Sequence, residues 1–336
     1  MGRLILCLAL MGLAGCGGGS GVARPMRKVR LAVGGAAQIV YLPVTLAREL
    51  GLYREEGLEV EFQDYPGGAK SLQSLLAGSA DVVSGFYDHT IQMAADGKQL
   101  RAFCVMLRHP GLALVVSPAA SRRIEKIEDL KGATIGVTAP GSSTHLFLNY
   151  LLEHHGLGVN AASVVGIGHA ASAIAAMEKG SVDAAVMTDP ALSNIVRRAG
   201  PVRILADTRT EQGVERELGV AIYPASVLYA APAWLQAEPE TARALARALR
   251  KTLNWMQEHS AREIAGRLPA AHRGNDEALF QAALTASMPI FSTDGLMPAE
   301  GPEAVRRVLA VSLPKVREAK IDLAATYTNA FVTPGR

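Results

Sequence analysis

The sequence predicts an α/β protein with two similar lobes, each a mainly parallel sheet with covering helices. The segments "GSADVVSG" (78–85) and "GSVDAAVM" (180–187) are nearly the same eight letters, and each follows a short amphipathic helix pattern. Their separation of 102 residues is too wide for a solenoid, whose units span roughly 20–50 residues. The length of 336 residues also suits two domains, at about 100–200 residues each.

The first copy alternates strand and helix patterns. We predict strands at 29–33, 58–62 and 80–86 and helices at 42–51 and 67–78. In the second helix, leucines recur at spacings of three and four residues, which places them on one face. A glycine ends each helix. The order β-α-β-α-β is typical of a parallel sheet with helices packed over it.

The second copy repeats this order. It has predicted strands at 133–137, 163–168 and 182–187 and helices at 142–156 and 170–180. In both copies the letters "GS-x-D" form the turn between a helix and the next strand. Serine and aspartate side chains bond the backbone of such turns, so we predict structural roles for Asp81 and Asp183.

The remaining chain shows no third repeat. A β-type run at 219–232 precedes two helical stretches, 234–268 and 276–287. We expect this part to complete the first lobe.

The first fifteen residues match an export signal. Arg3 precedes an apolar run, and small residues follow it, as at a cleavage site. The letters "LAGC" (13–16) also look like a bacterial lipobox, in which Cys16 is lipidated. We therefore expect a lipoprotein signal peptide, a tether and two lobes: 1–15, 16–27, 28–117 with 223–336 for lobe 1, and 118–222 for lobe 2.

Composition excludes several classes of protein. The formal charge of +3 implies neither a nucleic-acid surface nor an acidic partner. Once Cys7 leaves with the signal and Cys16 carries lipid, Cys104 is the one remaining cysteine, so no internal disulfide or CxxC metal site can form. Its apolar neighbours predict a buried thiol. We expect no cofactor and no metal.

Two glycine-containing turns are candidates for binding an anion. Ligands of parallel α/β sheets bind at the carboxyl ends of strands, where the turns 67–69 and 141–144 each open a helix. Unpaired N–H groups at a helix start suit an anionic group. The alternative is that these glycines only permit tight turns. Asp88 and Asp189 follow matching strands and could contact ligand or cap helices.

Motifs of catalysis and nucleotide binding are missing. "PGGAKS" (66–71) is no P-loop, because no glycine lies five residues before Gly68, and no G-x-G-x-x-G follows a strand. No serine nucleophile elbow or H-E-x-x-H accompanies the aspartates. We therefore predict that the protein is not an enzyme and has no catalytic residues.

Four segments together resemble a known family. They are "YLPVTLARELGLYREEGLEVEF" (41–62), "GGAKSLQSLLAGSADVV" (67–83), "IEDLKGATIGV" (127–137) and "VDAAVMTDP" (182–190). In this order they resemble the solute-binding receptors of ABC importers, specifically the nitrate, sulfonate, taurine and thiamine-pyrimidine binding group. The resemblance extends over most of residues 28–335.

The resemblance implies a two-lobe, type II periplasmic-binding-protein-like fold, with crossings near 116–120 and 219–224 and ligand in the cleft. It implies a monomer that serves an ABC permease and ATPase, anchored through Cys16 in the periplasm or at the cell surface, and that binds a small organic anion such as a sulfonate, taurine or nitrate. The ligand-binding positions it implies are Gln38, Ile39, Tyr41, Gly68, Ala69, Phe86, Asp88, Ser142, Ser143 and Asp189. Family members often carry Trp-x-Glu-Pro where this chain has "MTDP" (187–190).

Other functions stay open from the sequence. An exported lyase or hydrolase on the same fold could use Asp88 or His145. A receptor for thiamine-type pyrimidines or aromatic compounds would use Tyr41 and Phe86. A receptor of the same fold could also serve a sensor or chemotaxis partner in place of an importer.

Overall fold

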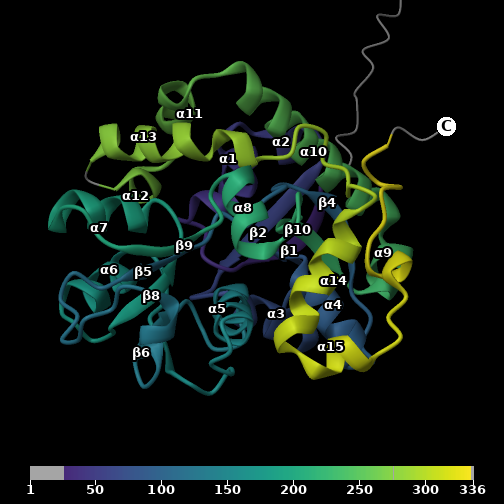
Figure 1. The fold of residues 1–336 in the computed structure, drawn as a ribbon. Helices are drawn as coiled ribbons and strands as arrows, with labels where there is room; N and C mark the ends of the chain where they lie inside the picture. The colour runs from purple at the N-terminus through teal and green to yellow at the C-terminus, as the bar shows by residue number, and fades with distance from the viewer. Residues whose placement is uncertain (1–25, 275, 334–336) are drawn as a thin grey trace, which may run out of the picture.

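The structure, a computed structural model, describes residues 26–274 and 276–333. Two five-stranded sheets with helices packed around them form two lobes (Figure 1). The predicted signal peptide, Cys16 and almost all of the tether lie outside the described residues. Among the helices of the described part, none is long and apolar enough to cross a membrane.

The first sheet has the strand order β2-β1-β3-β10-β4. Strands β1, β2 and β3 are parallel, and β10 runs antiparallel between β3 and β4. The strands are β1 (Arg27–Val33), β2 (Leu58–Asp64), β3 (Val82–Phe86), β4 (Arg101–Val105) and β10 (Ser226–Ala230). The chain thus returns to the first sheet through β10, which is much shorter than the β-type run at 219–232.

The second sheet has the order β7-β6-β8-β5-β9, with β5 as its antiparallel strand. The strands are β5 (Ala113–Val116), β6 (Thr134–Val137), β7 (Ser163–Gly166), β8 (Ala184–Met187) and β9 (Ile204–Asp207). Each position matches one in the first sheet, so the predicted pair of similar, mainly parallel lobes is confirmed.

Strand β5 corrects the expected lobe boundary. Its residues were expected in the first lobe, which was to end at residue 117, but they pair with β8 and β9 of the second sheet. The chain therefore crosses between sheets first at 106–112, ahead of the expected 116–120. The second crossing, 219–225, agrees with the expected position.

The four predicted helices of the two copies begin near the expected positions, as α1 (Leu42–Glu49), α3 (Gly68–Leu76), α5 (Ser143–His154) and α6 (Ala171–Glu178). Three further helices were not predicted: α4 (Asp88–Ala95), α7 (Ala191–Ala199) and α8 (Glu211–Leu218). Short helices η1 (Ile39–Tyr41), α2 (Leu52–Glu55) and η2 (Ile127–Leu130) lie between them.

The C-terminal helical stretch is more divided than predicted. The expected helix 234–268 is three helices, α9 (Pro232–Ala237), α10 (Pro239–Glu258) and α11 (Ala261–Arg267). Pro239 suits a helix start, and a capping box between Ser260 and Glu263 begins α11. The chain ends with α12 (Ala270–Arg273), α13 (Glu277–Ser287), η3 (Met288–Ile290), α14 (Gly301–Ser312), α15 (Pro314–Glu318) and η4 (Leu323–Thr326).

The repeated "GS-x-D" turns have the predicted structural role. Asp81 Oδ2 accepts the backbone N–H of Arg30 at 2.8 Å, and its own N–H donates to the Arg30 carbonyl. Asp183 makes the same two bonds with Thr134, also with 2.8 Å to the carboxylate. Each aspartate thus pairs with β1 or β6 just before its own strand enters the sheet.

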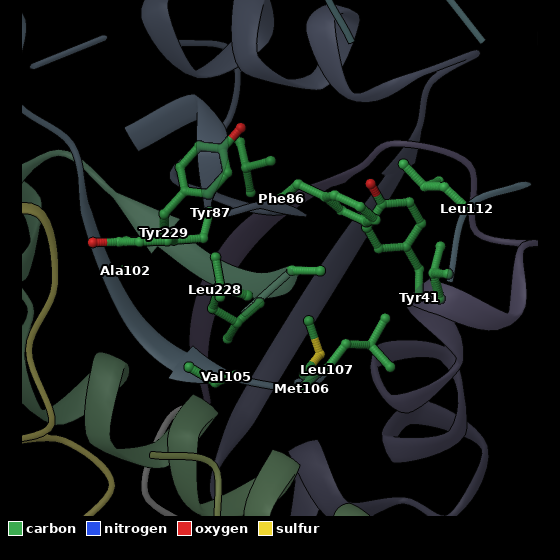
Figure 2. Close-up of a cluster of buried hydrophobic side chains, with 14 of the residues drawn as sticks. Tyr41, Phe86, Tyr87, Ala102, Val105, Met106, Leu107, Leu112, Leu228 and Tyr229 are labelled. Carbon is green, nitrogen blue, oxygen red and sulfur yellow. The ribbon is translucent and has the colours of Figure 1, made fainter. Parts of the chain in front are cut away.

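One hydrophobic cluster contains residues of both lobes, such as Leu31 and Ile135. In the first lobe it continues from Leu228 and Tyr229 on β10 to Tyr41, Phe86 and Leu112 beside the second lobe (Figure 2). Cys104 is buried in it, as predicted, and burial raises the pKa of its thiol to about 12. The cleft between the lobes is therefore walled by rigid core residues.

Candidate functional site: the cleft between the lobes

Turns from both sheets meet at a narrow cleft. The space enclosed there is about 10 Å³, roughly enough for one water molecule. Its lining includes six of the predicted positions and adds three threonines and three other neighbours: Gln38, Tyr41, Gly68, Phe86, Ser142 and Ser143 together with Thr138, Thr144, Thr188, Gly34, Val40 and Leu112. The structure is therefore a closed arrangement of the lobes.

Direct hydrogen bonds join the lobes across this cleft. Ser142 Oγ accepts the backbone N–H of Ala69 at 3.0 Å, and Ser143 Oγ donates to Asp88 Oδ1 at 2.8 Å. These four residues are among the predicted ligand-binding positions.

A second pair of bonds lies at the other end of the cleft. Thr188 Oγ1 donates to Gln38 Oε1 at 2.7 Å, and the N–H of Ile39 donates to the Asp189 carbonyl at 2.9 Å. Gln38 is held in turn by its Nε2, which donates to the Gly34 carbonyl at 2.8 Å. All ten predicted positions thus lie at or beside the interlobe contact, although their contact with a ligand stays a prediction.

Two helices from opposite lobes start at the cleft. Gly68 and Ser143, the first residues of α3 and α5, both line this cleft. The positive ends of both helix dipoles therefore lie at the same space, and neither helix has a side-chain cap of its own. A Cβ on Gly67 would lie 3.0 Å from Ser142 Oγ and from Thr138 Oγ1. The extended φ of Gly67 would suit any residue. Glycine is therefore required here by the close approach of the second lobe and not by the backbone conformation.

An aromatic wall lies beside these helix ends. Tyr41 and Phe86 pack edge to face with ring centroids 6.0 Å apart, an arrangement favoured by aromatic quadrupoles. Beyond them is a second small space with an apolar lining that includes Leu112, Phe147 and Tyr223. The cleft therefore combines polar donors at one end with an apolar surface at the other.

Asp88 is buried between the two parts of the cleft. Only 1% of the residue is exposed. Burial raises the pKa of its carboxyl above the usual range, against the opposing effects of His89 and of the Ser143 hydrogen bond. The neutral acid is the form that burial favours, and a neutral carboxyl can donate as well as accept.

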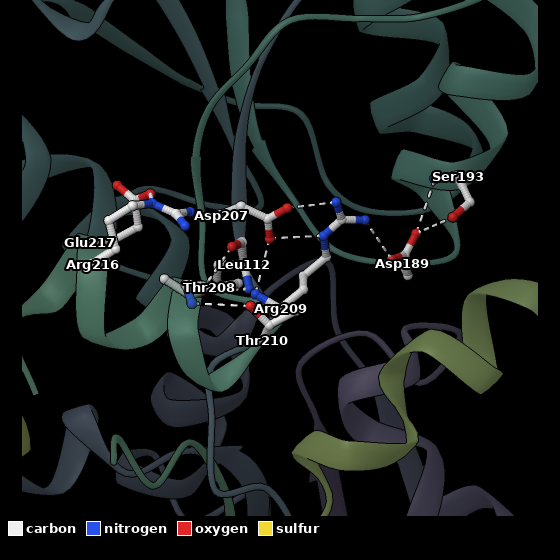
Figure 3. Close-up of polar contacts among 10 residues, drawn as sticks. Leu112, Asp189, Ser193, Asp207, Thr208, Arg209, Thr210, Arg216 and Glu217 are labelled. Carbon is white, nitrogen blue, oxygen red and sulfur yellow. Dashed lines mark hydrogen bonds and ion pairs between the residues drawn. The ribbon is translucent and has the colours of Figure 1, made fainter. Parts of the chain in front are cut away.

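The Asp189 side chain lies between Ser193 and Arg209 (Figure 3). Its Oδ1 accepts from the N–H and hydroxyl of Ser193, in the first turn of helix α7. Its Oδ2 pairs with Arg209 at 3.1 Å, and Arg209 also binds Asp207. The sequence left two roles open for Asp189, ligand contact or helix cap; in the structure its carboxylate bonds the first turn of α7 and Arg209, whereas the cap position of α7 is Pro190.

His145, a residue that an enzyme of this fold could have used, has a structural partner. His145 Nδ1 accepts the N–H of Gly141 at 2.9 Å, which fixes the turn before α5. Within the described ranges, no three His, Cys, Asp or Glu side chains are grouped as metal ligands.

Several residues at or beside the cleft were not among the predicted positions, and three of them are polar side chains of particular interest: Thr138, Thr188 and His89. Thr138 and Thr188 follow β6 and β8, at strand ends that the β-α-β pattern identifies. Buried His89 lies under the Gly68 turn, where its Nε2 is 3.3 Å from the Gly141 carbonyl. Its place after Asp88 in the third loop was the available signal.

The sequence matches the family described as NMT1/THI5 like over residues 38–263. The chain belongs to this family. A protein of known structure from Bordetella bronchiseptica RB50 is 40% identical, with 91% of this chain and 95% of that chain covered and a TM-score of 0.87.

Other relatives of this NMT1/THI5-like protein are more distant. The alkanesulfonate-binding protein SsuA from Xanthomonas axonopodis pv. citri, solved bound to MOPS, is 19% identical over 90% of this chain and 99% of that chain, with a TM-score of 0.71. YtlA of Bacillus subtilis (strain 168), provisionally named a binding protein, is 24% identical over 67% of this chain. That match spans 65% of YtlA, just under two thirds of its length.

At 19% identity, the similarity to SsuA shows a shared fold and nothing more. That fold is the two-lobe periplasmic binding protein fold, and it confirms the predicted fold class.

Proposed function

We propose that this protein is the substrate-binding component of an ABC importer and binds a small organic anion between its lobes. The observation that carries the proposal is the meeting of two uncapped helix starts, α3 and α5, at one cleft. Ser142 Oγ occupies the acceptor position of the Ala69 N–H, and an anionic oxygen of the ligand would replace it when the lobes reclose. Each such contact contributes about 0.3–2 kcal/mol, depending on burial.

The ligands of similar proteins support this class of ligand. These proteins include an alkanesulfonate-binding protein and a nitrate-binding protein from Synechocystis PCC 6803. A neutral Asp88 is compatible with an anion, because it adds a donor without adding negative charge. Contact with both lobes lets the ligand select the closed state, since only differential affinity shifts a conformational equilibrium.

A second candidate ligand is an aromatic compound, such as a thiamine-type pyrimidine. The edge-to-face pair Tyr41 and Phe86 would pack against a ring, and the Asp88 carboxyl would pair with an amino group. Binding of such a compound in place of anions would favour this candidate.

A thermal-shift screen tests the proposal. The mature protein is heated with taurine, butanesulfonate, nitrate, benzoate and an aminopyrimidine. A bound ligand at one hundred times its Kd adds about 2.7 kcal/mol of stability. We expect the sulfonates to shift the melting temperature of the wild type but not of the double variant Ser142→Ala/Ser143→Ala. Ser181→Ala, at an exposed turn, is the matched control. Ligand recovered chemically changed would indicate an enzyme.

We also propose that the protein is lipid-anchored through Cys16 on the outer side of a bacterial membrane. Radiolabelled palmitate should label the wild type and the Cys7→Ser variant, and both should sediment with membranes. The Cys16→Ser variant should carry no label. Label on that variant would contradict the anchor.

A further inference from the structure

His89, the second residue of α4, lies fully buried at the contact between the lobes. Its ring packs under the start of α3, because a Cβ on Gly68 would be 3.0 Å from the His89 Cε1. On the other side of the ring, Nε2 is 3.3 Å from the carbonyl oxygen of Gly141 in the second lobe. His89 therefore lies between the start of α3 and the turn that leads into α5.

The neighbours of the His89 ring determine which of its nitrogens carries hydrogen. A carbonyl oxygen can only accept, so Nε2 must donate to Gly141. Nδ1 faces the hydroxyl of Tyr229 at 3.5 Å. Burial raises the pKa of Tyr229 well above its ordinary value, so this hydroxyl keeps its hydrogen and can donate to Nδ1. The two partners therefore select the tautomer with hydrogen on Nε2, because the bond made by one ring nitrogen fixes the state of the other.

Gly141 is held by one histidine from each lobe. Its carbonyl accepts from His89, and its N–H donates to His145 Nδ1 at 2.9 Å. Burial lowers the pKa of His145, which favours the neutral ring that this acceptor role requires. Gly141 has a φ of 86°, in the left-handed region that favours glycine. The orientation of both peptide groups of this turn is therefore fixed when the lobes are closed.

Gly141 leads directly into the start of α5, where the anion is proposed to bind. Ser142 and Ser143 follow it and line the cleft. N–H groups at a helix start bind an anion only if they point at it. A site that is already held in its bound conformation loses less entropy on binding and has a higher affinity. Fixing Gly141 therefore strengthens anion binding by the residues that follow it.

We propose that His89 is a positioning residue for the anion site. In the closed state it donates its Nε2–H to Gly141 and holds the start of α5 in the orientation that presents its N–H groups to the ligand. When the lobes open, this bond is lost and the turn is released on one side. His89 thus contributes to affinity without touching the ligand, since it is absent from the lining of the cleft. The inference rests on the proposed function, because a positioning residue requires a ligand that binds there.

Calorimetric titration of the mature protein with butanesulfonate tests this role. His89→Leu removes the N–H donor and should weaken binding by about tenfold. His89→Gln keeps a side-chain N–H donor of similar length and should restore most of the affinity. His154→Leu, at the exposed far end of α5, is the matched control and should bind like the wild type. Urea unfolding without ligand measures separately how much stability each variant loses through packing.

Nitrogen-15 NMR of histidine-labelled protein gives a second readout. In the butanesulfonate complex, His89 should carry hydrogen on Nε2, and hydrogen on Nδ1 alone would overturn the inference. Equal affinity of the wild type and His89→Leu would also overturn it. Equal losses of affinity in His89→Leu and His89→Gln would show that the ring serves packing and not the N–H bond, with the same consequence. A wild type that binds no anion would instead contradict the proposed function, and the inference with it.

Discussion

Asp81 and Asp183 are equivalent residues with different surroundings. Both bond the first strand of their lobe through one carboxylate oxygen. Asp81 also pairs with the Arg30 side chain at 2.6 Å. Partial burial opposes the ionised form of Asp81, but the hydrogen bonds from Arg30 outweigh it and the pKa of this carboxyl is lowered. The two lobes therefore share one turn, and only the first reinforces it with charge.

Asp81→Asn should destabilise the protein by about 1 kcal/mol at pH 7, the usual contribution of such a hydrogen bond. Because the folded pKa is lowered, the carboxylate stabilises the fold above its unfolded pKa, about 3.9. That contribution is lost as the pH falls through the folded pKa. Urea unfolding at pH 7 and pH 3 should show the gap between wild type and variant shrinking at low pH. A gap of equal size at both values would contradict the assignment.

Asp88 should show the opposite pH dependence. Its pKa is raised by burial, so the folded state holds the proton more tightly than the unfolded state. The wild type should lose stability relative to Asp88→Asn as the pH rises from the unfolded pKa to the folded one. Thermal unfolding of both proteins between pH 4 and pH 8 measures this difference. Parallel curves would mean that the pKa of Asp88 is the same in the folded and unfolded states and would contradict the effect of burial.

At the scale of elements, the starts of α3 and α5 define the cleft. Gly67 lies where the second lobe approaches most closely, and any Cβ there would meet Ser142 and Thr138. The glycine is therefore needed by closure and not by the local fold of the first lobe.

Gly67→Ala should weaken ligand binding by about tenfold, which corresponds to about 1.4 kcal/mol, since closure must push two side chains aside. The substitution should have little effect on the conformation of the turn itself. Gly266→Ala is the control, because its Cβ would meet nothing within 4 Å and alanine favours the helix. Calorimetry with the best ligand of the screen compares the two. Equal affinity of the two variants would mean that the ligand-bound lobes do not close against Gly67.

The strands and helices of the repeat were predictable because their hydrophobic periodicity is strong and glycines mark their ends. Strand β9 and helices α4, α7 and α8 were not predicted. Strand β9 has only four residues, and one of them, Ile204, is more than one third exposed. The antiparallel direction of β5 depends on how the chain crosses between lobes, which no local pattern records.

The cleft positions were predictable as strand ends, but their contacts were not. Ser143 and Asp88 are 55 residues apart in the chain, and only the packing of one lobe on the other pairs them. The role of Asp189 was open for the same reason, because Arg209, its partner, comes from a segment in which the sequence predicted no element.

At the scale of the whole molecule, the proposed function depends on opening and closing of the two lobes. The central cleft of this structure has room for about one water molecule, so an organic ligand can enter this cleft only after the lobes open. The hydrogen bonds across the cleft are few and replaceable, whereas the crossings 106–112 and 219–225 are covalent. Opening should therefore be a rotation about these crossings.

Small-angle X-ray scattering measures this rotation. The radius of gyration of the ligand-saturated wild type should be smaller than that of the free protein. Ser142→Ala/Ser143→Ala should keep the larger value with ligand present, because it loses both cross-lobe serine bonds. Free and saturated wild type of equal size would contradict a closing mechanism.

The position of β10 has a consequence for biosynthesis. Strand β4 ends at residue 105, and the neighbour that joins it to the first sheet begins at residue 226. During synthesis from the N-terminus, β3 and β4 of the first lobe lack their shared neighbour β10 until the whole second lobe has been synthesised. The second lobe has all five of its strands within one continuous segment and can finish first. Vectorial folding therefore starts in the middle of this chain, and its N-terminal lobe is the last to be completed.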